Sequence, residues 1–148
     1  MQSFAAITEN SHFYQMFATR MLSVLSLVHL LYLMDVIQRR PLHRRYLKLY
    51  RDWKFFRINI AIAFAFILIK AFLIPAGQVS LCTAPMVFIL LSRLLIKHSI
   101  LRNGKPFIFL HRGDLVKGST ADHVYSFLLL AGSLVLGILC DYLWTTYY

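Results

Sequence analysis

The sequence predicts an all-α integral membrane protein, with four transmembrane helices arranged as two hairpins and a basic amphipathic helix between spans one and two. Hydrophobic residues make up 59% of the 148 residues, and they are concentrated in four long runs. The mean hydropathy is +0.62. The Lys and Arg residues cluster between these runs, as the positive-inside rule describes for cytoplasmic loops. The length suits one domain, so residues 1–148 are expected to form a single four-helix unit.

The first span is predicted over residues 13–37. Apart from His29 and Asp35, the run from residue 21 to residue 37 is apolar. Aromatic residues from Phe13 onward suit the membrane interface. The stretch is long enough to cross a bilayer with some tilt.

A basic stretch, residues 41–57, follows the first span. Its apolar residues recur in steps of four and three, which places them on one side of a helix; they are Leu42, Tyr46, Leu49, Trp53 and Phe56. The opposite side is basic, and Pro41 suits a first helical turn. We expect this helix to lie in a cytoplasmic loop, residues 38–55, next to a membrane surface. The residues expected to contact lipid or a partner are Arg44, Arg45, Lys48, Arg51, Trp53 and Lys54.

The second and third spans are predicted over residues 56–75 and 84–101, joined by a short turn. Helix is expected to run unbroken from the basic stretch into the second span, or to bend where the charges stop. The third span carries Arg93 near its middle. It either crosses fully, with Arg93 facing a bundle, or crosses half-way, with its cations directed to the cytoplasmic face. The tight turn before it favours a full crossing.

A polar loop over residues 102–122 leads to a fourth span over residues 123–144. The short apolar segment from Phe107 to Leu110 is expected either to lie on the bilayer surface or to pack on the basic helix. Ser119 or Thr120 is a candidate cap for the last helix, and Asp122 favours its positive end. Trp144 and the tyrosines after it form an aromatic anchor.

The distribution of charge predicts an orientation. Eight Lys or Arg residues lie between Arg39 and Arg57, and four lie in the loop over residues 102–122. The turn between spans two and three has none, and the two tails together hold only Arg20. Both basic loops are therefore expected in the cytoplasm and both termini on the other side. The host would be a bacterial inner membrane or a eukaryotic endomembrane.

Charged residues inside the predicted spans are candidates for structural pairs or for an ion path. Lys70 and Asp141 lie at similar depth and are expected to pair, while Asp35 is expected to meet Arg93 or Lys97. A structural role is favoured, because a proton path would need several titratable groups in sequence. His29 is expected to hydrogen-bond to a neighbouring helix. Cys82 and Cys140 share one predicted side; two free thiols are favoured over a disulfide.

Three functions fit these patterns. The favoured one is a non-catalytic membrane subunit or scaffold, which contacts anionic lipid headgroups or other membrane subunits through its basic face. The second is a small transporter or channel that uses the intramembrane charges. The third is a small homo-oligomeric membrane enzyme. No cofactor is expected because motifs for phosphate and metal binding are missing. The formal charge of +10 is explained by topology, so nucleic-acid binding is not expected.

The enzyme hypothesis rests on a resemblance to one protein family. Four spans and a basic first loop resemble the membrane-associated eicosanoid and glutathione metabolism family. The second helix of that family carries an Arg or Glu, then Asn, then an acid. Arg57 and Asn59 are the nearest match here, and the acid that should follow is missing. The resemblance implies an oligomeric enzyme that binds glutathione, and no site residue is transferred from it.

Overall fold

The computed structural model describes residues 2–34, 45–73, 80–109 and 119–147, and within these ranges it is helical with no strand. The helices are α1 (Gln2–Leu33), α2 (Arg45–Arg51), α3 (Trp53–Leu73), α4 (Ala84–Asn103) and α5 (Thr120–Tyr147). Four stretches are long and apolar enough to cross a membrane: Phe13–Leu33, Trp53–Phe72, Ala84–Asn103 and Thr120–Tyr147. The prediction of an all-α chain with four such helices is confirmed.

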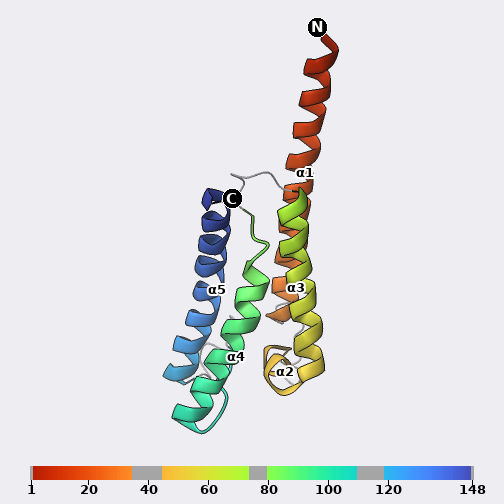
Figure 1. The fold of residues 1–148 in the computed structure, drawn as a ribbon. Helices are drawn as coiled ribbons and strands as arrows, with labels where there is room; N and C mark the ends of the chain where they lie inside the picture. The colour runs from red at the N-terminus through yellow and green to blue at the C-terminus, as the bar shows by residue number, and fades with distance from the viewer. Residues whose placement is uncertain (1, 35–44, 74–79, 110–118, 148) are drawn as a thin grey trace.

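The four long helices run side by side, and consecutive ones point in opposite directions (Figure 1). The short helix α2 lies at the lower end of the bundle, together with the end of α4 and the start of α5. Both chain termini point toward the upper end, where α1 extends beyond the other helices. This arrangement places the described parts of the two basic stretches, α2 with the start of α3 and the end of α4, at the same end of the molecule.

Helix α4 is the centre of the bundle, because it packs against each of the other four helices. Its buried residues recur at helical spacing along the whole length of the helix; they are Ala84, Pro85, Phe88, Ile89, Ser92, Leu95, Ile96 and Ser99. The helix passes through Arg93 without a break and ends at Gly104, whose positive φ of 70° closes the last turn onto the carbonyl of Ile100. Of the four stretches able to cross a membrane, Ala84–Asn103 therefore has the largest buried share.

Helices α4 and α5 approach each other closely at Gly137. A Cβ atom added there would lie 2.9 Å from the Cα atom of Ala84, so the two backbones meet with no side chain between them. The hydroxyl of Thr83 donates to the carbonyl of Gly137 at 2.6 Å. At Gly132 an added Cβ would instead meet the tip of the Leu91 side chain, at 2.8 Å. Only the first of these contacts is between backbones.

The basic stretch forms two helices where its spacing predicts one. Asp52 separates α2 from α3, and its Oδ1 accepts hydrogen bonds from the backbone N–H groups of Lys54 (2.9 Å) and Phe55 (3.1 Å). These bonds satisfy N–H groups in the first turn of α3, as an N-cap does. The side chain of Asp52 thus starts a new helix within the stretch that was predicted to be one helix. Residues 41–44 of that stretch lie outside the described ranges.

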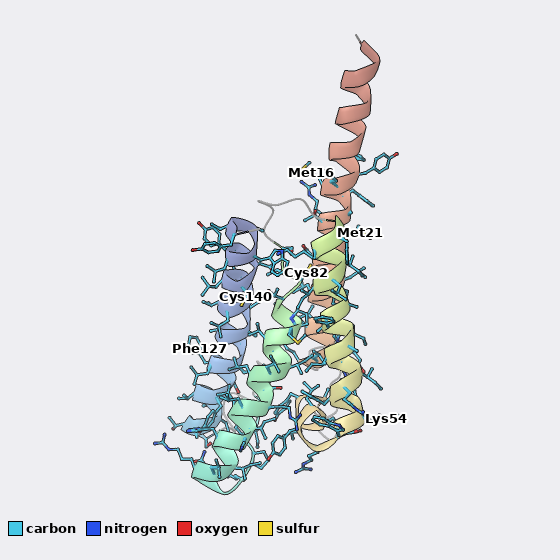
Figure 2. The ribbon with its side chains drawn as sticks, viewed as in Figure 1. Met16, Met21, Lys54, Cys82, Phe127 and Cys140 are labelled. Carbon is cyan, nitrogen blue, oxygen red and sulfur yellow. The ribbon has the colours of Figure 1, made fainter. Side chains whose placement is uncertain are left out.

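The outer surface of the long helices is apolar (Figure 2). Large side chains with more than half of their surface exposed include Phe72, Leu94, Phe127 and Val135. Apolar surface of this extent is unusual on a protein surrounded by water, whereas a bilayer accommodates it. The described chain has almost no structure beyond these helices, so the multi-pass membrane class follows from both sequence and fold.

Candidate functional site

A buried ion pair joins α3 to α5 near the upper end of the bundle. Lys70 Nζ lies 2.9 Å from Asp141 Oδ1, and the two side chains are only 4% and 0% exposed. Both residues lie within stretches able to cross a membrane. Because an unpaired charge is costly in the hydrocarbon region, each of these two residues compensates the charge of the other.

The second oxygen of Asp141 holds the chain segment that precedes α4. Its Oδ2 accepts hydrogen bonds from the backbone N–H of Ser80 (3.1 Å) and from the hydroxyl of Ser80 (2.8 Å). On α1, the hydroxyl of Ser26 donates to the carbonyl of Leu81 at 2.7 Å. We call Ser26, Lys70, Ser80, Thr83 and Asp141 the Lys70–Asp141 centre. Side chains from three helices therefore converge on this centre.

The segment over residues 80–83 is non-helical although it lies alongside the spanning stretch of α5. Ser80 is level with Asp141, and Thr83 is level with Gly137. Backbone without helical hydrogen bonds is tolerated at membrane depth only where the protein itself satisfies it. The Lys70–Asp141 centre meets this requirement, and its evident role is to dock this segment. Cys82 in the segment is buried, and both it and the exposed Cys140 are free thiols, as favoured from sequence.

His29 makes a second polar contact between helices. Its Nε2 lies 3.1 Å from Oδ1 of Asn59 on α3, and the amide N–H₂ of Asn59 donates to the carbonyl of Phe55 at 2.8 Å. Since the amide nitrogen is committed to Phe55, its oxygen accepts and His29 Nε2 carries the proton. The expected hydrogen bond from His29 to a neighbouring helix is confirmed. Asn59 does not titrate, so this contact links helices and does not extend a proton path.

A second polar cluster, at the lower end, holds the short apolar segment 107–109 from both sides. On one side, the hydroxyl of Tyr46 in α2 donates to the carbonyl of Phe107 (3.0 Å) and accepts from the N–H of Phe109 (2.9 Å). On the other, Asp122 Oδ1 accepts from the N–H of Ile108 at 2.6 Å. The segment thus packs between α2 and α5, which is the second of the two expected locations.

Removing the Tyr46 hydroxyl is expected to loosen this segment. Tyr46→Phe leaves the carbonyl of Phe107 and the N–H of Phe109 without their partner, at a cost of about 1–3 kcal/mol in unfolding free energy. Hydrogen–deuterium exchange should become faster at Phe109. The matched control is Tyr50→Phe on the same helix, since the Tyr50 hydroxyl makes no hydrogen bond with any described residue. Equal exchange in both variants would contradict the assigned role.

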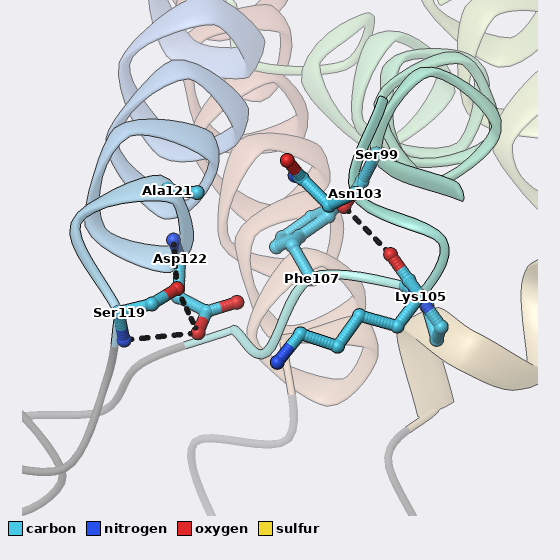
Figure 3. Close-up of a pocket in the computed structure, with 8 residues that line it drawn as sticks. Ser99, Asn103, Lys105, Phe107, Ser119, Ala121 and Asp122 are labelled. Carbon is cyan, nitrogen blue, oxygen red and sulfur yellow. Dashed lines mark hydrogen bonds between the residues drawn. The ribbon is translucent and has the colours of Figure 1, made fainter. Parts of the chain in front are cut away.

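Ser119 and Asp122 cap α5 reciprocally (Figure 3). The hydroxyl of Ser119 accepts from the N–H of Asp122 at 3.3 Å, while Asp122 Oδ2 accepts from the N–H of Ser119 at 3.1 Å. This is the capping-box arrangement, and it selects Ser119 from the two expected caps. A hollow of about 230 Å³ opens beside it, lined also by Asn103 and Lys105.

The predicted contact residues are distributed over α2 and the start of α3. Lys48, Arg51 and Lys54 are exposed. Arg45 instead turns toward α1: its Nη1 donates to the carbonyl of Tyr32 at 3.1 Å, and its guanidinium lies 3.8 Å from the centre of the Tyr32 ring. A cation at this end of a helix is favourable, so Arg45 stabilises the end of α1. Arg44 lies outside the described residues.

Arg93 is placed against aromatic rings. Its guanidinium carbon lies 4.1 Å from the ring centre of Phe56 and 5.0 Å from that of Trp53. Trp53 is 57% exposed, although its spacing predicts the same face as the buried Tyr46 and Leu49. Phe56, on the same predicted face, is buried, so among the described residues the expected stripe is interrupted only at Trp53. The expected partner Asp35 lies outside the described residues.

Sequence reasoning missed Ser80, Tyr46 and the capping role of Asp52. Tyr46 and Asp52 bond to backbone groups, whereas Ser80 donates its own N–H and hydroxyl to the carboxylate of Asp141. Neither periodicity nor charge is a signal for such bonds; only an acid followed by a long apolar helix hints at a cap. Within the described ranges, no three His, Cys, Asp or Glu side chains gather as metal ligands. A comparison with protein-family models, curated proteins and solved structures finds no match to this chain.

Proposed function

We propose that the protein is a non-catalytic integral membrane subunit or scaffold of a larger membrane assembly. In this role it contacts anionic lipid headgroups or partner subunits through a basic cytoplasmic face. The observation that carries the proposal is that polar side chains inside the bundle bond to other parts of the protein. Lys70, Asp141 and His29 each bond to another helix or to the segment before α4. Groups committed in this way hold helices together.

The proposed topology is two hairpins with both termini non-cytoplasmic, in a bacterial inner membrane or a eukaryotic endomembrane. It is supported by the position of the exposed cations in the described chain, all but one of which lie on α2, the start of α3, or the end of α4 and just beyond. These are Lys48, Arg51, Lys54, Arg57, Lys97, Arg102 and Lys105, with Arg20 the exception. Because basic loops stay in the cytoplasm, this end is assigned there.

Gentle solubilisation followed by mass measurement tests the subunit proposal. The protein, extracted in mild detergent from its own membrane, is expected to migrate with other membrane subunits as a complex heavier than any oligomer of this chain alone. The same preparation in a harsh detergent is the control and should release the single chain. A uniform particle that contains only this chain and retains an activity would overturn the proposal.

Charge reversal tests the topology. Replacing Arg44, Arg45, Lys48 and Arg51 by Glu is expected to flip or destabilise the orientation, because positive residues near the spans set it. The sharper variant reverses only Lys48, Arg51 and Lys54, which leaves the contact of Arg45 with α1 intact. Protease protection of a tag at each terminus reports the outcome. Exchanging the same three residues between Lys and Arg is the control, and normal insertion of the reversed variant would refute the assignment.

A transporter remains the second candidate because of one specific observation. A non-helical segment, residues 80–83, lies beside a buried ion pair at a depth covered by α5, and broken helices next to charges are typical of transport sites. Asp141→Asn keeps the shape of the site and removes its charge. Ion or proton flux into proteoliposomes that falls in this variant would favour transport over the scaffold; unchanged flux would favour the scaffold.

The enzyme hypothesis is the third. Asn59 is relevant to it, because this residue is the nearest match to the Asn of the family pattern. Its amide is occupied by His29 and by the carbonyl of Phe55, so it acts as a link between α1 and α3. Calorimetry with glutathione at millimolar concentration tests this hypothesis directly. Measurable heat that saturates would support it, and no heat would exclude glutathione as a ligand.

A further inference from the structure

We propose that the hollow between the end of α4 and the start of α5 is a binding site for one anionic glycerophospholipid. It has a volume of about 280 Å³ and is lined by Arg102, Asn103, Thr120, Ala121, Val124 and Tyr125. This site is separate from the exposed cations of α2. Its location at headgroup level rests on the proposed orientation.

The polar half of the hollow suits a phosphate ester. Arg102 supplies an exposed guanidinium, which binds phosphate oxygens with two parallel hydrogen bonds. Asn103 and Ala121 also line the neighbouring hollow shown in Figure 3, so the two hollows adjoin, and Lys105 supplies a second cation in that neighbour. The headgroup phosphate is therefore assigned to Arg102, with Lys105 beside it.

One acid, Asp122, faces the neighbouring hollow. Its oxygens are occupied by the N–H of Ile108, the N–H of Ser119 and the hydroxyl of Ser119. The carboxylate is thus committed to the cap of α5 and to the segment over residues 107–109. Among the described residues that line the two adjoining hollows, two cations stand against this one acid, and this positive balance favours an anionic headgroup over a zwitterionic one.

The apolar half of the hollow leads toward the membrane interior. Val124 lines the hollow and is 52% exposed; Leu128 and Val135 lie one and three turns farther along the same face of α5 and are 45% and 62% exposed. An acyl chain attached to a headgroup in the hollow would run along this stripe. A cationic depression continuous with an exposed apolar stripe is what separates a phospholipid site from a site for free phosphate.

Lipid titration followed by native mass spectrometry tests the site on the full chain. The probes are phosphatidylglycerol and phosphatidylcholine with identical acyl chains. In the variant R102Q/K105Q, phosphatidylglycerol affinity is expected to fall about 25-fold, at roughly fivefold for each cation lost. The matched control R57Q/K97Q removes two exposed cations at the same end that belong neither to the expected contact residues of α2 nor to the lining of the hollow, and its affinity for a first lipid should change less than about threefold.

A third variant, Val124→Trp, fills the hollow without changing charge, and it should also lose phosphatidylglycerol binding. Equal losses in the two charge variants, with binding kept in Val124→Trp, would show diffuse attraction to the basic end and overturn the discrete site. Binding of glycerol phosphate as tight as that of the lipid would show an anion site and overturn the role of the stripe. Neither result would alter the complex mass or the tag protection that test the proposed function.

Discussion

Asp141→Leu is expected to destabilise the protein by about 3–5 kcal/mol, the largest effect of any single substitution considered. The variant leaves the Lys70 ammonium buried without its counter-charge, and an uncompensated buried charge carries a penalty of this size. It also removes both hydrogen bonds that hold Ser80. Reversible unfolding in mixed detergent micelles, followed by circular dichroism, measures the change in unfolding free energy.

The double variant Lys70→Met with Asp141→Leu separates the charge from the hydrogen bonds. An apolar pair of similar volume is often no less stable than a buried ion pair, so the double variant should be more stable than Asp141→Leu alone. The bonds to Ser80 remain lost, and hydrogen bonds in membrane proteins contribute only about 0.6 kcal/mol on average. If the loss of unfolding free energy in the double variant equals the sum of the losses in Lys70→Met and Asp141→Leu, the two residues do not stabilise one another.

Gly137→Val is expected to lose about 1–3 kcal/mol in stability, because it overpacks the contact between α4 and α5. Its Cβ would lie 2.9 Å from the Cα atom and 3.0 Å from the Cβ atom of Ala84. Backbone atoms of a packed helix have no alternative rotamer, so α4 and α5 must move apart. The separation should also weaken the 2.6 Å hydrogen bond from Thr83 to the carbonyl of Gly137. Unfolding in detergent gives the loss, and cysteine cross-linking across the two helices gives the separation.

Gly132 provides the matched control on the same helix. An added Cβ there meets only the Cδ2 atom of Leu91, which is the end of a flexible side chain that can rotate away. Gly→Ala substitution within a helix is intrinsically favourable by about 1 kcal/mol. Gly132→Ala should therefore be neutral or stabilising, while Gly137→Ala should destabilise. The reverse order would mean that the α4–α5 contact at Ala84 is looser than the structure shows.

The four long helices were predictable because each one satisfies a constraint that acts on a whole segment. A bilayer requires about 20 apolar residues in a row, and such runs stand out in a sequence even when one cation interrupts them. The proximity of Lys70 to Asp141 followed from the same logic, since two charges placed at equal depth in neighbouring spans have few other partners. The depth of a residue in the membrane can be read from its distance to the ends of its apolar run.

Features that depend on one side chain and one backbone group were not predictable. Asp52 lies inside a stretch whose spacing predicts one continuous helix, yet its carboxylate caps the start of α3. Ser80 and Tyr46 each bond to chain segments about 60 residues away. Such bonds leave no periodic trace, because any residue able to reach the backbone group would serve. Their partners are fixed only once the helices have packed.

The Lys70–Asp141 centre has a consequence for biosynthesis. Lys70 is made 71 positions before Asp141, so α3 enters the bilayer while its counter-charge is still to be translated. Until then its ammonium must stay near the headgroups, which a long flexible side chain permits at modest cost. Ser80 and Thr83 likewise have no hydrogen-bond partner on α5 until that helix is made. Synthesis of α5 thus completes the hydrogen bonding of the segment before α4, and a chain released before α5 would expose an unpaired membrane lysine.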